Sequence, residues 1–281
     1  MPKLNRLRAR FVQIQNIEKM TNVMEMIANA KIPKIKNKFK IVQEYFENLD
    51  YIFQNILANL SKKVEELTNA DSKKNLYIIF GSNLGFCGAL NNLILKNVVP
   101  QLQKNDEIIV FGEKIYNFLS INYSNLIIKF FLNIEETNFS EPILEISNFV
   151  NQSIFERKYK KIFICYNKFI SIIHSSPEMQ NLFDFKKNTI KYGGYGIEFE
   201  PNATEVFKKL MPFYIKSILE KLFIESKLVE TSTRRTSMES ALKMPVEILH
   251  KFRNRNNSSR PAMITPEIIE IISGKMLKKL G

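Results

Sequence analysis

Apolar residues recur every three or four positions along the N-terminal end of the chain. They form one narrow stripe from Leu4 to Ile27, and the same spacing resumes after Pro33 and continues to Leu67. Residues 1–70 contain no glycine, so the pattern predicts a helix or helix pair on the order of 95 Å long. Since a compact globule of this size is not that wide, the helix is expected to protrude or to pair along its length.

The middle of the chain changes to short apolar runs that are typical of buried strands. The runs are rich in β-branched and aromatic residues and occupy residues 75–80, 107–112, 125–132 and 161–169. Longer stretches between them, such as residues 89–102 and 140–157, are long enough for crossover helices. Alternating strands and helices predict a mostly parallel sheet in a small Rossmann-like α/β domain.

The helical period returns at Asn202, which stands three residues before Glu205 as a predicted cap pair. This second helical stretch reaches the C-terminus and matches the first in length, so the two ends are predicted to form a long antiparallel coiled coil. The predicted segments are an N-terminal coiled-coil helix (1–70), an α/β domain closed by the loop 191–201 (71–200) and a C-terminal coiled-coil helix (201–281).

Positive charge is concentrated on the two predicted helices. The chain carries 41 Lys and Arg against 28 Asp and Glu, for a net charge of +13, which predicts an acidic partner. Residues 1–40 hold ten basic residues against two acidic ones, and residues 230–281 hold ten against five. Only Met238 is apolar within residues 230–240, so this segment is expected to face water or to slide past another protein.

The cysteines and histidines predict no metal site. Cys87 and Cys165 are isolated and are expected to be buried, reduced thiols, and His174 and His250 are equally isolated. Charged residues interrupt every apolar run well short of the roughly 18 residues needed to span a bilayer, and the first residues lack an apolar signal core. Any membrane role is therefore expected to be peripheral.

Three glycines follow the first predicted strand and raise the question of a nucleotide site. A phosphate-binding loop needs Lys and Ser or Thr after its last glycine, but Ala89 and Leu90 follow Gly88. The spacing of Gly81, Gly85 and Gly88 also departs from the dinucleotide fingerprint. A tight turn with close helix packing is the favoured interpretation.

No other residues form a catalytic set. The serines and threonines lack a partner histidine, and the carboxylates are scattered along helix faces. Glu135 and Glu136 are adjacent and are expected to point in different directions. The chain is predicted to have no active site and no cofactor.

Five collinear segments resemble the gamma subunit of the rotary F-type ATP synthase, and the chain is identified as a divergent member of that family. They are "IEKMTNVMEMIANAKI" (17–32), "GSNLGFCGALNN" (81–92), "YNKFISIIHSSPEMQNLFDF" (166–185), "ETSTRRTSMESA" (230–241) and "NSSRPAMITPEIIEIISG" (257–274). The resemblance implies a non-catalytic central-stalk subunit of a proton-translocating ATP synthase, which carries torque between the c-ring and the catalytic beta subunits. Its implied partners are the alpha and beta subunits, the epsilon subunit and the c-ring. Its implied location is the cytoplasmic face of the bacterial inner membrane, without insertion into it.

The resemblance also implies which residues contact these partners. By position in the matching motifs they are Lys19, Thr21, Met24, Gly81, Gly85, Gly88, Glu230, Arg234, Met238, Arg260, Ile264, Thr265 and Glu267.

Four prolines depart from the pattern of a continuous shaft. Pro261 and Pro266 stand where the family has glutamine, and Pro33 and Pro245 are two further helix breakers. Each proline removes an N–H and costs roughly 3 kcal/mol if the helix does not kink. The prolines predict a kinked or segmented shaft, with a fresh helix start at Thr265.

Two alternatives belong to other classes of protein. A basic coiled-coil protein that binds nucleic acid would use the positive charge to follow phosphates, but only Phe11 and Phe39 interleave aromatics with the basic residues of 1–40. A nucleotide-binding enzyme built on the middle domain would bind ATP or NAD through residues 71–200.

Overall fold

The computed structural model describes residues 2–60, 72–182 and 199–277, and side chains for 12–57, 60, 72–182 and 199–243. The chain divides into two units. We name them the terminal unit, Met1–Ile27 with Thr236–Gly281, and the sheet unit, Ala28–Arg235. The boundaries fall inside the two long helices. The three predicted segments remain a prediction, and most of the predicted closing loop, 191–198, lies outside the described residues.

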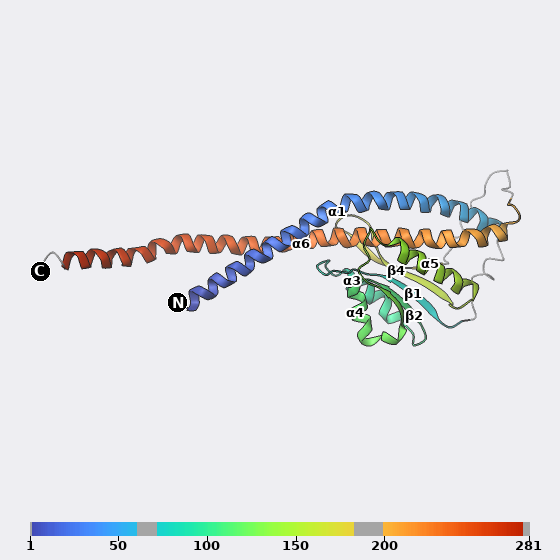
Figure 1. Cartoon of the computed structure of the whole chain (residues 1–281), viewed down its shortest axis with the longest axis horizontal. Coiled ribbons are helices and arrows are strands. Elements are labelled where there is room, and N and C mark those ends of the chain that lie inside the picture. Colours follow the sequence, from blue (N-terminus) through green and yellow to red (C-terminus); the bar gives the residue numbers. More distant parts are fainter. Residues whose placement is uncertain (1, 61–71, 183–198, 278–281) are drawn as a thin grey trace. The chain divides into compact units, whose positions relative to one another are not determined.

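Two long helices begin and end the described chain (Figure 1). Helix α1 comprises Pro2–Leu60 and helix α6 comprises Ala203–Leu277. The predicted cap pair is confirmed, because the Asn202 Oδ1 atom accepts the Glu205 N–H at 2.9 Å. Asn202 thereby satisfies one of the amide groups that the first turn of α6 leaves without a helical partner.

The prediction of a shaft divided into separate helix segments was wrong, whereas kinking at the prolines stays a prediction. Helix α1 continues through Pro33, and α6 continues through Pro245, Pro261 and Pro266, so that no helix ends or restarts at any of them. A proline removes only one helical hydrogen bond, and the bonds of the neighbouring turns keep the helix continuous around it.

The sheet unit contains a five-stranded sheet with the order β3-β2-β1-β4-β5. Its strands are β1 Asn75–Phe80, β2 Glu107–Phe111, β3 Ile127–Phe131, β4 Lys161–Phe169 and β5 Ser175–Asn181. The first four run parallel, with Ile78 opposite both Ile109 of β2 and Ile164 of β4. The predicted mostly parallel sheet is therefore confirmed.

Strand β5 was not predicted, because its sequence lacks the apolar run on which the prediction depended. It is half-buried along its whole length and pairs antiparallel with β4, with Ser175 opposite Phe169. The turn between them is closed by the His174 carbonyl, which accepts the N–H groups of Ile170 and Ser171. Pro177 fits this strand because an edge strand leaves one row of N–H groups without a ladder partner.

Helices cover both faces of the sheet. The helices between the strands are α3 Leu90–Val98, α4 Glu113–Asn122 and α5 Ser140–Phe155, with short 3-10 turns η1 Val99–Gln101 and η2 Ser124–Leu126. Alternate strand residues point to opposite faces. Tyr77 and Ile79 pack in one cluster with α3 and α4, whereas Leu76 and Ile78 pack in another with α5, α1 and α6.

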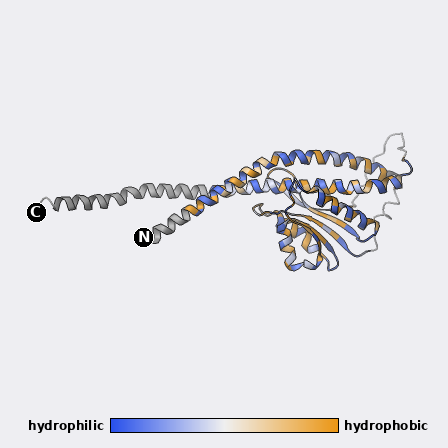
Figure 2. Cartoon of the chain, in the orientation of Figure 1, coloured by the Kyte–Doolittle hydropathy of each residue, from blue (hydrophilic) through white to orange (hydrophobic). Residues whose placement is uncertain are grey.

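Within the sheet unit, α1 and α6 lie side by side and antiparallel. Phe53 stacks on Tyr214 with ring centroids 4.1 Å apart, while Phe46, one heptad earlier in α1, meets both Tyr214 and the later residue Lys221. The Tyr214 hydroxyl donates to an oxygen of Asp50 at 3.1 Å. Figure 2 shows polar and apolar residues alternating along both helices, as a partly buried helix requires.

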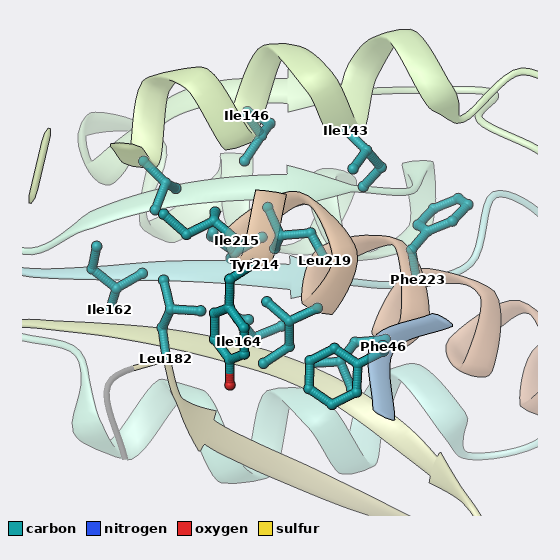
Figure 3. Packing of buried hydrophobic residues seen from close by; sticks show 14 of the residues in the cluster. Phe46, Ile143, Ile146, Ile162, Ile164, Leu182, Tyr214, Ile215, Leu219 and Phe223 are labelled. Carbon is teal, nitrogen blue, oxygen red and sulfur yellow. The ribbon is translucent and has the colours of Figure 1, made fainter. Parts of the chain in front are cut away.

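The largest core cluster joins α6 to α5 and β4 (Figure 3). Tyr214, Ile215 and Leu219 of α6 lie in one cluster with Ile143 of α5 and Ile164 of β4. The predicted fold class, an α/β sheet domain with two long terminal helices, is confirmed.

From Leu222 to Ser232 every residue of α6 is buried. The prediction that the polar segment 230–240 faces water was therefore wrong for its first three residues. The Thr231 hydroxyl donates to the Lys227 carbonyl of its own helix at 2.9 Å, and Glu230 is ion-paired. Polar side chains satisfied in this way can be buried without a large cost.

Candidate functional site

The glycine-containing loop follows β1 at the carboxyl end of the parallel strands. A Cβ atom on Gly81 would lie 2.6 Å from Ile115 Cδ1, and Gly88 has a φ of 58°. Close packing therefore requires the first glycine, and a left-handed turn favours the third. A Cβ on Gly85 would lie 3.8 Å from Lys114 Cε, an ordinary contact. The structural interpretation of the glycines is confirmed for Gly81 and Gly88.

Side-chain amides fix the path of this loop. The Ser82 N–H donates to Asn91 Oδ1 at 3.1 Å, and the Asn91 amide donates back to Ser82 Oγ at 2.7 Å. Asn83 connects the loop to the one after β3, since its amide donates to the Ile134 carbonyl at 2.9 Å and its Oδ1 accepts the Asn133 N–H at 3.1 Å. The two loops are thereby held as one structure.

Arg234 of α6 binds the same loop through main-chain carbonyls. Its guanidinium donates to the Leu84 and Gly85 carbonyls, both at 3.3 Å, and to Glu230 Oε1 at 2.8 Å. The other oxygen of Glu230 accepts from Lys227 at 3.0 Å. The side chains of Lys227 and Glu230 are 6% and 7% exposed, so this ion pair is nearly dry. We call Lys227, Glu230, Arg234 and loops 81–89 and 132–139 the loop cluster.

Glu135 and Glu136 converge on one lysine, so the prediction that they point in different directions was wrong. Lys31 of α1 lies 3.1 Å from Glu135 and 3.2 Å from Glu136. The alternation rule applies to strands, and these residues lie in a turn after β3. Burial lowers the pKa of Lys31, but the two carboxylates outweigh it and raise the pKa above its ordinary value. Burial also opposes the charge of Glu135, yet Lys227 and Lys31 hold its pKa below the usual range.

The charged groups of the loop cluster neutralise one another. Its cations and carboxylates bind one another, and the Gly81 and Ser82 N–H groups donate to the Phe111 carbonyl and to Asn91. Burial raises the pKa of the Cys87 thiol, which keeps it protonated. No group of His, Cys, Asp and Glu that could hold a metal ion occurs within the described residues. The arrangement fixes two loops to α6.

The other predicted contact residues lie in the terminal unit. Lys19 is exposed, Met24 is half-buried, and Thr21 is buried with its hydroxyl bonded to the Ile17 carbonyl at 2.8 Å. Met238 is buried. Arg260, Ile264, Thr265 and Glu267 belong to α6, and their side chains lie outside the described residues. The structure therefore brings together Gly85, Glu230 and Arg234 from the predicted set.

Sequence reasoning missed Lys31, Lys227, Asn83 and Asn91. Lys227 stands three residues before Glu230, a spacing that places the two side chains together on a helix and could have revealed the pair. Asn83 and Asn91 lie inside the glycine motif itself. The contacts of Lys31 with Glu135 and Glu136 span about a hundred positions, and no local signal could have revealed them.

Comparison with known proteins identifies the class of protein to which the chain belongs. The sequence model of the family described as ATP synthase matches residues 3–276. Solved structures with a similar fold include the central stalk and c-ring of the Tetrahymena thermophila mitochondrial ATP synthase. That match has a TM-score of 0.57 at 21% identity and covers 79% of this chain and 99% of that one. A chain of the Euglena gracilis mitochondrial ATP synthase gives a TM-score of 0.54 at 17% identity, covering 91% and 94%.

Curated relatives give the particular family. The ATP synthase gamma chain of Mycoplasmopsis pulmonis is 31% identical over 98% of this chain and 100% of its own length. That of Mycoplasma mycoides subsp. mycoides is 32% identical, with 98% of each chain covered. The chain therefore belongs to the ATP synthase gamma chain family. None of these matches supports the nucleic-acid-binding alternative.

Within residues 2–60, 72–182 and 199–277, every helix is too short or too polar to span a bilayer.

Proposed function

We propose that this chain is the central-stalk subunit of a proton-translocating ATP synthase and transmits torque between the c-ring and the catalytic beta subunits. The observation that carries the proposal is the burial of part of α6 by the rest of the sheet unit. Eleven consecutive residues of this helix, Leu222–Ser232, are buried there on every side. Since α6 continues to Leu277, it can carry a twist out of the sheet unit.

In this role the subunit has no catalytic residues of its own. We propose that it assembles with the alpha, beta and epsilon subunits and the c-ring as a hetero-oligomer. It would lie at the cytoplasmic face of the bacterial inner membrane without inserting into it. The net charge of +13 supports partners with acidic surfaces, because charge attraction varies slowly as the shaft turns.

The predicted contact residues fit this role in two groups. In the loop cluster, Leu84 and Phe86 are 58% and 63% exposed beside Gly85, so the loop presents apolar side chains while Arg234 holds its backbone. We propose that this loop meets the epsilon subunit or the c-ring. In the terminal unit, Lys19 and its exposed neighbours Met20 and Val23 would face the ring of alpha and beta subunits.

Co-purification tests the proposal directly. A tagged copy of the full chain should bring down the alpha, beta and epsilon subunits from solubilised membranes. Replacing exposed Phe86 with Asp should weaken recovery of epsilon or the c-ring while leaving alpha and beta bound. The matched control is Ile121→Asp, at a position that is 78% exposed on α4, away from the loop. Recovery of the tagged chain without any of these subunits would refute the assignment.

Restoring glutamine at Pro261 and Pro266 tests coupling separately. Because α6 already runs through both positions, we expect proton-driven ATP synthesis in membranes to stay within about twofold of the native rate. The C-terminal helix should melt at a higher temperature, since each glutamine returns an N–H to it. A large gain in synthesis would show that the prolines limit torque transmission.

A further inference from the structure

A second polar site lies at the opposite end of the sheet from the loop cluster, where β1 and β4 begin. A pocket of about 240 Å³ opens there, lined among others by Lys73, Lys160, Lys161, Asn75 and Tyr77. Asn75 is opposite Lys161 and Tyr77 is opposite Phe163 in the parallel ladder. Alternate residues of the two strands therefore share one face and build the pocket from both sides.

The floor and rim of the pocket supply further hydrogen-bonding groups. Tyr77 and Phe163 stack with ring centroids 5.2 Å apart and form an aromatic base. The Tyr77 hydroxyl donates to the Gln101 carbonyl at 3.4 Å, and burial raises the pKa of this phenol to about 12, so it keeps its proton. Gln101 and Gln103 also line the pocket, and the Gln101 amide donates to the Asn97 carbonyl at 3.0 Å.

Two acidic groups among the described residues lie beside the pocket, and the charge of one of them, Asp106, helps to raise the pKa of Tyr77. Asp106 uses one oxygen to accept the Asn75 N–H and the other to accept the Gln103 N–H, both at 2.9 Å. Glu107 binds Lys74 at 3.5 Å and Lys158 at 2.9 Å. Neither of these two acids forms an ion pair with Lys73, Lys160 or Lys161.

Glu107 is also held as a charged group. Its second oxygen accepts from the Tyr159 hydroxyl at 2.6 Å. Burial would raise the pKa of this carboxyl, but Tyr159 and Lys158 outweigh it and lower the pKa below the ordinary value. Glu107 therefore places one negative charge between Lys74 and Lys158.

Among the described residues, no carboxylate forms an ion pair with Lys73, Lys160 or Lys161. Lys73, Lys160 and Lys161 thus line a polar pocket whose lining, among the described residues, contains no acid. Like charges around one pocket repel one another, and an anion placed among them lowers that repulsion. Lysine ammonium groups form charge-assisted hydrogen bonds with phosphate oxygens in many protein sites.

We infer that this basic pocket binds a phosphate group, carried either by a free phosphate compound or by a lipid headgroup. The inference does not depend on the proposed rotor function, because it rests on the sheet unit alone. The three lysines hold the phosphate oxygens, and the amides of Asn75 and Gln103 orient whatever is attached to the phosphate.

The test uses the purified full chain and inorganic phosphate as the probe. Titration followed by ³¹P line broadening in low-salt buffer should give saturable binding that weakens as added salt shortens the screening length. The variant K73Q/K160Q/K161Q should bind at least about tenfold more weakly, since each ammonium contributes a charge-assisted contact.

The matched control is K36Q/K96Q/K209Q, which removes the same charge from three exposed positions of the sheet unit and should bind as the parent does. The single variant K160Q should lose part of its affinity for phosphate. It provides a test that remains valid if the triple variant does not fold. Circular dichroism checks that each variant is folded.

A second arm separates the two sources of phosphate. Vesicles of phosphatidylcholine with and without phosphatidylglycerol are sedimented with the parent and both triple variants. Binding to the anionic vesicles that only K73Q/K160Q/K161Q loses supports a lipid headgroup, and saturable binding of inorganic phosphate supports a free compound. The inference is overturned if the parent binds neither probe, or if both triple variants lose binding equally.

Discussion

Replacing Glu230 with glutamine tests whether the buried ion pairs of the loop cluster stabilise the packing of α6 in the sheet unit. Glutamine keeps the volume of the side chain but removes its charge. Lys227, whose side chain is 6% exposed, would then lose its partner at 3.0 Å, and Arg234 would lose its partner at 2.8 Å. The substitution leaves a nearly dry ammonium group without its ion-pair partner, with Glu135 as its remaining acidic neighbour.

The expected cost is about 3–5 kcal/mol of unfolding free energy, because removing one partner of a buried ion pair is far more expensive than losing a surface pair. The second substitution Lys227→Met removes that charge and should recover at least about 1.5 kcal/mol, which makes the two changes strongly non-additive. The control Glu44→Gln breaks an exposed pair with Lys40 at 3.8 Å and should cost less than about 0.5 kcal/mol.

Urea unfolding of the full chain, followed by circular dichroism, provides the measurement. With a slope of about 3 kcal/mol per molar, the midpoint of Glu230→Gln should fall by at least about 1 M. The reasoning is refuted if this variant and Glu44→Gln shift the midpoint equally. It is equally refuted if adding Lys227→Met makes the Glu230 variant still less stable.

Three further predictions concern other parts of the sheet unit. Gly81→Ala should lower stability by about 1–3 kcal/mol because its Cβ would overlap Ile115 Cδ1, whereas Gly85→Ala should be nearly neutral; thermal melts distinguish them. Tyr159 and Lys158 hold the pKa of Glu107 below its ordinary value in the folded chain, so Glu107 stabilises the fold above its ordinary pKa, and the stability gap to Glu107→Gln should close as the pH falls through the folded pKa. Arg234→Ala should free the loop and speed thiol labelling of Cys87 at least about tenfold, while the other cysteine stays protected and serves as the internal reference.

The sheet and the long helices could be predicted because their signals are local. The runs at 75–80 and 161–169 coincide with β1 and β4, and Asn202 caps α6 as its spacing predicted. Strand β5 could not be predicted, since it is a polar edge strand that forms by pairing with β4. Its conformation comes from a tertiary contact and not from its own composition.

The candidate site was predictable only in part. Glu230 and Arg234 were chosen from the motif, but their burial was not, because a polar sequence such as 230–240 suggests a solvated surface. The ion pair with Lys227 and the carbonyls of the glycine loop reverse that expectation. Such compensation depends on which distant loops meet the helix, and composition does not contain that information.

The burial of α6 from Leu222 to Ser232 has a mechanical consequence. Successive residues of a helix are rotated by about 100°, so three buried turns place anchoring side chains at every angle around its axis. Rotation of this helix about its own axis, relative to the sheet, would have to break contacts in all directions at once. The packing therefore opposes such a rotation. Force applied about the axis must then deform the whole sheet unit or turn it as one body.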